Sequence, residues 1–162
     1  MEDIEALTSH SNVDLQIWAS LATMLERLPA ALDEQLQRDS ELTHFEFGVL
    51  YALARTRDGA LRLSVLAEYS NSTLSRLSRA VTRLEARGWV RREVDPTDGR
   101  YTLAILTPAG STTVREALPG HLALVERVVF GALTPAQART LGAACERINT
   151  AISPARRWEQ PG

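Results

Sequence analysis

The sequence predicts a single, mainly α-helical domain with one small β-hairpin. Apolar residues recur at steps of three and four over much of the 162 residues, which is the spacing of amphipathic helices. Thr43, Thr107 and Thr134 each stand where the N-terminal cap of a helix is expected. The pair Asp98 and Gly99 separates two short segments rich in β-forming residues, which favours a hairpin. A chain of this length typically forms one domain.

The composition excludes several classes of protein. Hydrophobic residues make up 44% and charged residues 23%, which is typical of folded globular proteins. No apolar run approaches the roughly 20 residues of a membrane helix, and the acidic start differs from a signal peptide. We therefore expect a soluble, cytoplasmic protein without a membrane partner. The single cysteine, Cys145, excludes a disulfide within the chain and a multi-thiolate metal site.

The net charge of −2 is unevenly distributed along the chain. Residues 1–42 carry nine acidic residues and two arginines, whereas residues 43–107 carry ten arginines and seven acidic residues. A basic central segment favours a polyanionic partner. All 18 basic residues are arginine, whose planar guanidinium suits phosphates and guanine edges. A codon usage rich in arginine explains the absence of lysine equally well.

A long amphipathic helix is expected from Val13 to about Arg38. Pro29 lies inside it, so we expect a kink or a break there. An apolar stripe of this length has to be covered by another surface, either of this chain or of a second copy. The stripe consists of Ile17, Leu21, Leu25, Leu28, Leu32 and Leu36.

The central segment predicts three more helices in close succession. Thr43 and Glu46 form a capping box that opens a helix running to Ala54. A short helix follows from Leu63 to Tyr69. The polar residues 70–72 supply a turn and the cap of the next helix, which extends from about Ser72 to Arg87.

The helix at 72–87 has two different faces. Its four arginines occupy a sector roughly 80° wide, centred some 135° from its apolar stripe. One face therefore suits a hydrophobic core and the other a polyanion. The arginines are Arg76, Arg79, Arg83 and Arg87, and the stripe is Leu74, Leu77, Val81 and Leu84.

A β-hairpin follows this helix. Gly88 ends the helix as a C-cap, and strands are expected at Trp89–Val94 and Arg100–Leu106 around a turn at Asp95–Gly99. Thr107 and Thr134 are each followed by proline, which favours the first position of a helix. These caps predict helices at Pro108–Phe130, with a kink at Pro119, and Pro135–Ile152.

This order of elements is that of a winged helix-turn-helix, in which the second helix enters a major groove and the hairpin forms the wing. Several motifs, in order, resemble the MarR family of bacterial transcription regulators. They are Leu66–Glu68, Ser72–Leu77, Arg83–Arg92, Asp95–Arg100 and Leu106–Gly110.

The resemblance implies one domain over residues 1–162 that forms a homodimer on a pseudo-palindromic operator in double-stranded DNA. Residues 13–42 and 108–152 would be dimerisation helices. Residues 43–107 would be the winged helix-turn-helix lobe, and residues 153–162 a loose tail. The function implied is that of a sequence-specific regulator, most often a repressor that a small ligand releases.

The resemblance also implies which residues contact DNA. Asp98 would orient the wing and Arg100 would contact the minor groove or its phosphates. Thr97 departs from the family, because many members have a further basic residue there, so a weaker wing is expected. Arg91 and Arg92 alternate across a strand, so at most one of them faces the DNA. The predicted contacts in the major groove are Ser72, Thr73, Ser75, Arg76, Arg79 and Arg83.

Many members of the family bind phenolic or other aromatic anions between the dimer helices and the DNA-binding lobe. By this resemblance, Trp18, Phe45 and Tyr51 would line such a cleft and Arg55 would meet the anion. For each of these aromatic residues taken singly, ordinary core packing is the favoured interpretation, because it is the more frequent role.

Nothing in the sequence predicts catalysis, a metal or a cofactor. No nucleophile and base are paired at a recognisable spacing, and His10, His44 and His121 share no metal-ligand spacing. Cys145 lies on the apolar stripe of the last helix, where a buried, inert thiol is expected. The alternative function is a protein-interaction module that keeps the fold and has lost DNA binding, because an arginine stripe by itself is usually a solvated face.

Overall fold

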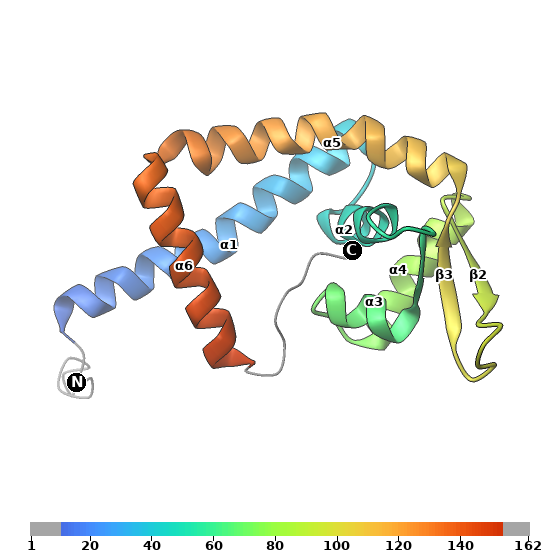
Figure 1. The fold of residues 1–162 in the computed structure, drawn as a ribbon. Coiled ribbons are helices and arrows are strands. Elements are labelled where there is room, and N and C mark those ends of the chain that lie inside the picture. The colour runs from blue at the N-terminus through green and yellow to red at the C-terminus, as the bar shows by residue number, and fades with distance from the viewer. Residues whose placement is uncertain (1–10, 154–162) are drawn as a thin grey trace, which may run out of the picture.

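The computed structural model describes residues 11–153, so residues 154–162 of the predicted loose tail, the acidic residues at positions 2, 3 and 5, and His10 lie outside the described residues. The described residues form two regions, a helical arm and a small winged lobe (Figure 1). The arm contains α1 (Asn12–Ser40), α5 (Pro108–Val128), the 3-10 helix η2 (Phe130–Ala132) and α6 (Pro135–Ile152). The lobe contains α2 (His44–Ala54), β1 (Ala60–Arg62), α3 (Leu63–Tyr69), α4 (Leu74–Ala86), β2 (Val90–Val94) and β3 (Thr102–Leu106).

The predicted caps start their helices as the sequence indicated. The Thr43 side chain accepts the Glu46 N–H at 3.1 Å, and the Glu46 carboxylate accepts the Thr43 N–H at 3.1 Å. Thr107 accepts the Gly110 N–H at 3.1 Å, and Thr134 forms a capping box with Gln137. Such caps satisfy N–H groups that have no partner within a helix. These short-range contacts explain why the helix starts were predictable.

Two local predictions need correction. The cap of α4 is Thr73, whose hydroxyl accepts the Arg76 N–H at 3.2 Å, rather than a residue of the turn at 70–72. Pro29 lies inside α1, which continues unbroken to Ser40, so of the expected kink or break the break is excluded. A proline removes only one backbone donor, and the remaining turns of a long helix hold it together.

The sheet has three antiparallel strands in the order β1-β3-β2, so the predicted hairpin is only part of it. In the hairpin Val90 pairs with Leu106 and Val94 with Thr102, and on the other side of β3 Ala60 pairs with Ile105. The strand β1 was not predicted, because three residues are too short to show alternation.

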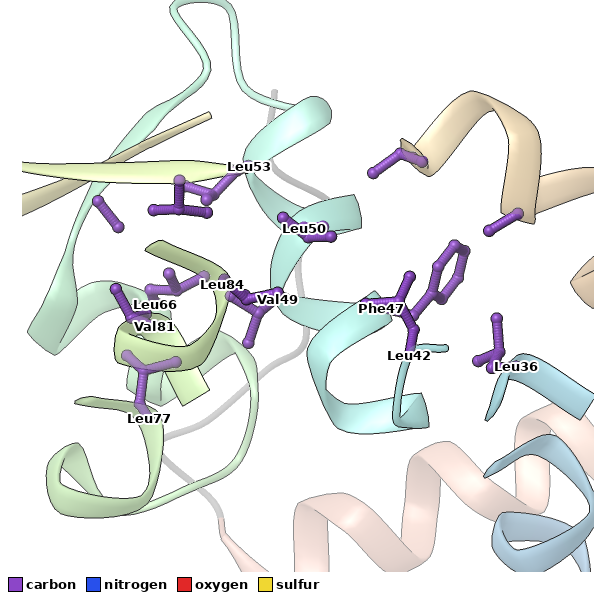
Figure 2. Packing of buried hydrophobic residues seen from close by; sticks show 14 of the residues in the cluster. Leu36, Leu42, Phe47, Val49, Leu50, Leu53, Leu66, Leu77, Val81 and Leu84 are labelled. Carbon is purple, nitrogen blue, oxygen red and sulfur yellow. The ribbon is translucent and has the colours of Figure 1, made fainter. Parts of the chain in front are cut away.

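The core of the lobe is centred on α2 and continues into the arm. Figure 2 shows Val49, Leu50 and Leu53 of α2 packed among leucines of α3 and α4. On the other side Phe47 lies beside Leu36 of α1, and the same cluster includes side chains of α5. The apolar contacts that hold the lobe together therefore also attach it to the arm.

The arm leaves much apolar surface uncovered. Leu36 at the lobe end of α1 is fully buried, whereas Ile17 and Leu25 of the same stripe are 62% and 55% exposed. No residue of α6 is buried, and Cys145 is exposed, which corrects its expected burial. The reason is that α6 turns away from α5 and η2 at 105° and packs on little of its own chain (Figure 1).

No single helix within residues 11–153 has the length and hydropathy to cross a membrane, and only the bent pair formed by α5–η2 and α6 meets that criterion.

Candidate nucleic-acid interface

The orientation of α4 is fixed by its buried face and by the hydrogen bonds at its C-terminus. Leu77, Val81 and Leu84 are fully buried, so the outer face of the helix is set by the core. At its C-terminus Gly88 has φ 73° and donates its N–H to the Glu85 carbonyl at 2.9 Å. The Trp89 N–H donates to the Leu84 carbonyl at 3.0 Å, which completes a Schellman motif. Only glycine adopts this left-handed conformation without cost.

Three of the four predicted arginines are held by the junction of α1 and α2. The Arg76 guanidinium lies 4.4 Å from the centre of the Phe45 ring, a cation–π contact. Arg83 Nε donates to Glu46 Oε1 at 2.6 Å. Arg87 Nη1 donates to the backbone carbonyl of Glu41 at 2.8 Å.

Arg79 differs from these three arginines. It is exposed, and no hydrogen bond, ion pair or ring contact engages it within the part of the chain that the structure describes. Its five N–H donors therefore point to solvent from the middle of the outer face.

Glu46 is the anion that anchors Arg83. The residue is buried and accepts hydrogen bonds from Thr43 and Arg83. Burial on its own would raise the pKa of Glu46, but the hydrogen bonds from Arg83 and Thr43 outweigh it and lower the pKa. Glu46 is thus a charged acceptor at neutral pH, and it holds Arg83 although that side chain stays 58% exposed.

The outer face of α4 is hollowed along both flanks, and Arg79 borders both hollows. The α1–α2 flank has a cleft of about 390 Å³, and the opposite flank an open groove of about 470 Å³. The cleft is lined by Asp33, Thr43, Phe45, Arg76, Arg79 and Arg83. The groove is lined by Leu74, Ser75, Ser78, Arg79 and Thr82.

At the wing, Asp95 organises the turn between β2 and β3. Its carboxylate is 5% exposed and accepts the N–H and hydroxyl of Thr97 at 2.8 and 2.7 Å and Arg62 Nε at 2.6 Å. The Thr97 hydrogen bonds, followed by that of Arg62, lower the pKa of Asp95 to about 2. Arg62 also lies 4.3 Å from the centre of the Tyr101 ring. Thr97 itself carries no positive charge, but Arg62 of the upstream strand β1 brings a guanidinium group to this turn.

Asp98 and Arg100 pair directly. Arg100 Nη2 donates to Asp98 Oδ2 at 2.7 Å and Nε donates to Oδ1 at 3.0 Å, while the Arg100 side chain remains 83% exposed. The hydrogen bond from Arg100 lowers the pKa of Asp98, and its reciprocal raises the pKa of Arg100. Both groups are therefore charged over the physiological range, and the guanidinium projects from the turn in a defined orientation.

The neighbouring arginines of β2 are engaged within the protein. Arg92 Nη2 donates to the Ser78 carbonyl at 2.9 Å and to Thr82 Oγ1 at 2.5 Å. These hydrogen bonds connect β2 to α4. Arg91 pairs with Glu93 of the same strand.

The four predicted ligand residues do not line one cleft within a single chain. Only Phe45 borders the cleft beside α4. Tyr51 is six residues from Phe45, a spacing that places the two side chains on different faces of α2. It stacks instead on Phe47, with 5.9 Å between the ring centres. Trp18 lies exposed on α1, and Arg55 is exposed at the end of α2.

The described residues contain no group of three or more potential metal ligands. Two of the three histidines nevertheless meet, because the rings of His44 and His121 stack with 5.6 Å between their centres. Burial lowers the pKa of both, so each favours the neutral form. Their spacing in the sequence gave no sign of this contact, which depends on the packing of α2 against α5.

The sequence also missed two residues near the predicted interface. The sequence places Leu74 on the apolar stripe of α4, but its side chain is 53% exposed. Leu74 is the first residue of the helix, and the first turn of α4 extends beyond the edge of the core. Arg62 carried no signal, since its partners Asp95 and Thr97 lie 33 and 35 residues further along the chain.

Comparison with known proteins identifies the same region. A family model described as MarR family matches residues 40–100. The HTH-type transcriptional regulator YdcH of Bacillus subtilis (strain 168) is 28% identical over 116 residues, which cover 69% of this chain and 71% of that protein. The transcriptional regulator HosA of Escherichia coli O111:H- is 34% identical over 79 residues, or 49% of this chain and 57% of HosA.

Solved structures extend the similarity to nearly the whole chain. The MarR family regulator Sco3205 of Streptomyces coelicolor, solved in complex with DNA, is 38% identical with a TM-score of 0.89, covering 95% of this chain and 96% of Sco3205. The regulator AbsC of the same species is 29% identical with a TM-score of 0.85, covering 90% and 97%. As the sequence predicted, these relatives are regulators rather than enzymes. The chain belongs to the MarR family of DNA-binding transcriptional regulators.

Proposed function

We propose that the protein acts in the cytoplasm as a homodimeric repressor, that it binds a pseudo-palindromic operator through α4 and the wing, and that a small aromatic anion releases it. The observation that carries this proposal is the outer face of α4. Arg79 projects there without a partner among the described residues, between arginines that neighbouring elements hold in place. A face organised before binding loses little side-chain entropy on contact with DNA.

The geometry supports a separate role for each of the predicted arginine contacts. Arg79 has all its donors available for a guanine edge, and Arg76 and Arg83 are positioned for phosphates. Arg100, held by Asp98, suits the adjacent minor groove. The predicted contacts also include three hydroxyl residues, Ser72, Thr73 and Ser75. The Thr73 hydroxyl already caps α4, so Thr73 would contact DNA through its backbone or its methyl group.

Dimerisation supplies the second half-site. The uncovered apolar stripe of α1 and the uncovered face of α6 favour a second copy of this chain as the covering surface. Two lobes related by a twofold axis would then meet successive major grooves about 34 Å apart.

The DNA-binding proposal is tested by fluorescence anisotropy with the promoter region beside the protein's own gene. Arg76→Ala combined with Arg79→Ala removes four positive charges per dimer. We expect affinity to fall at least about 30-fold and the log–log salt slope to decrease by about 2, because one Arg76–phosphate contact is lost in each half-site. The matched control, Arg38→Ala combined with Arg115→Ala, removes the same charge from the arm and should change affinity less than about threefold.

The alternative function makes the opposite prediction. If the wild-type protein bound no DNA sequence even at low salt, the chain would be an interaction module that keeps only the fold. Equal binding by the double variant and the wild type would leave DNA binding intact and refute the assignment of the interface to α4.

The ligand response is supported by the cleft on the α1–α2 flank. An aromatic ring and three arginines line it, which suits a small aromatic carboxylate or phenolate. The regulator BpsR of Bordetella bronchiseptica, 28% identical with a TM-score of 0.71, has its DNA binding regulated by 6-hydroxynicotinic acid. Titrating the promoter complex with this compound tests the proposal, because release of DNA at millimolar or lower concentration is expected. Release that Phe45→Ala does not weaken would place the ligand elsewhere.

A further inference from the structure

Leu74 is an exposed leucine at the start of the helix that faces the DNA. It is 53% exposed, whereas Leu77, Val81 and Leu84 of the same helix are fully buried. Leu74 is also absent from the hydrophobic cluster that unites the lobe with the arm. Its side chain therefore contributes little to folding and is accessible to a binding partner.

The surroundings of Leu74 place it in the proposed interface. It borders the open groove of about 470 Å³ together with Ser75, Ser78, Arg79 and Thr82. Two of these residues, Ser75 and Arg79, are predicted DNA contacts. Leu74 is the first residue of α4, and the N-terminal residues of a recognition helix are those that reach base edges.

The chemistry of the major groove limits what this side chain can contact. Each base pair presents hydrogen-bond donors and acceptors there, and the 5-methyl group of thymine is the only methyl group. A leucine neither donates nor accepts a hydrogen bond, and placing it over a donor or acceptor would remove that group from water without compensation. The thymine methyl group is the part of a base edge that gains most from contact with leucine.

We propose that Leu74 is a specificity-determining residue that packs against the 5-methyl group of a thymine in each half-site. The inference rests on the proposed binding of α4 in the major groove. It adds the recognition of a thymine, a base that arginine contacts do not select. Hydrogen-bonding residues such as Arg79 would recognise guanine, and Leu74 would recognise an A·T pair beside it.

The probe for the test is the tightest duplex that the full-length protein enriches from a random-sequence pool. Each symmetric pair of thymines is replaced by deoxyuridine, which lacks the 5-methyl group and keeps every hydrogen-bonding group. Loss of one buried methyl contact is worth about fourfold in affinity, so replacement in both half-sites should weaken the wild-type complex about 15-fold at one symmetric position.

Two variants identify the side chain responsible. In Leu74→Ala the same replacement should change affinity less than about twofold, because the partner of the methyl group is gone. Leu74→Met keeps an apolar side chain and should retain the sensitivity to deoxyuridine. Thermal unfolding of both variants checks that folding is unchanged, as expected for an exposed position where alanine favours a helix.

Two other outcomes would overturn the inference. If no thymine pair is sensitive, or if the sensitivity is the same in Leu74→Ala, Leu74 does not contact a thymine methyl, while sequence-specific binding through α4 stands. If the pool yields no enriched duplex, the proposed sequence-specific function itself fails and this inference fails with it.

Discussion

At the scale of single residues, charged groups of the proposed DNA-binding surface are held by partners inside the protein. Arg100 is oriented by Asp98, and Arg83 by the buried Glu46. In the wing turn Asp95 accepts three hydrogen bonds from Thr97 and Arg62. A carboxylate satisfied in this way stabilises the fold only while it is ionised.

The substitution Asp95→Asn should therefore destabilise the protein in a pH-dependent manner. The pKa of Asp95 is about 2 in the folded protein, against an ordinary value of 3.8, so its stabilisation is complete above about pH 5 and is lost as the pH falls towards 2. The difference in free energy of unfolding between wild type and variant should be largest at pH 7 and shrink at pH 2, as measured by urea denaturation. The exposed Asp58, changed to asparagine, is the control. A difference that stays constant from pH 7 to pH 2 would contradict this account.

At the scale of elements, the start of α5 is packed tightly against the sheet. Thr107 Oγ1 donates to the Gly88 carbonyl at 2.7 Å, and the Thr107 N–H donates to the Trp89 carbonyl at 3.0 Å. A Cβ atom on Gly110 would overlap the Trp89 carbonyl oxygen and lie 2.8 Å from a methyl group of Leu106. This contact joins the arm directly to the DNA-binding lobe.

Gly110→Ala should consequently lower the free energy of unfolding by about 2 kcal/mol, because the backbone oxygen of Trp89 cannot move aside cheaply. Thermal or urea denaturation measures the change. Gly48→Ala is the matched control, since a Cβ there meets no atom within 4 Å in the exposed part of α2. That control should gain up to about 1 kcal/mol from helix propensity. Similar effects at both positions would show that the start of α5 is not closely packed.

At the scale of the whole molecule, the arm and the lobe differ in how completely they are buried. The lobe has a continuous core around α2, whereas the arm leaves Ile17 and Leu25 of α1 and the whole of α6 uncovered (Figure 1). A small domain gains little from leaving so much apolar surface in water. In the proposed homodimer the arm is therefore the part of the protein that a second copy would cover.

Leu25→Asp should separate the proposed dimer into monomers. A carboxylate buried without a partner costs several kcal/mol, so self-association should weaken at least about 100-fold in sedimentation equilibrium. DNA affinity should fall with it, because each lobe alone meets one half-site. The control Thr23→Asp adds the same charge on the opposite face of α1 and should leave the dimer intact. A wild-type protein that sediments as a monomer, or a Leu25→Asp variant that remains a dimer, would refute dimerisation through this stripe.

Sequence alone was enough to predict the features that depend on neighbouring residues. The capping box at Thr43, the helix cap at Thr134, Gly88 at the end of α4 and the turn before β3 each involve groups three to five residues apart, so the chain specifies them locally. The motifs of the DNA-binding lobe belong to the same class, and the family they indicated is confirmed by the comparisons.

Only the tertiary structure decided which of the predicted site residues are engaged and which are available. Arg83 meets Glu46 across 37 residues and Arg62 meets Asp95 across 33, while β1 joins β3 from a segment with no strand pattern. The exposure of Leu74 and Cys145 likewise depends on where the core ends. Such contacts depend on the path of the whole chain, because side chains distant in sequence meet only after the helices have packed. The spacing of neighbouring residues therefore does not predict them.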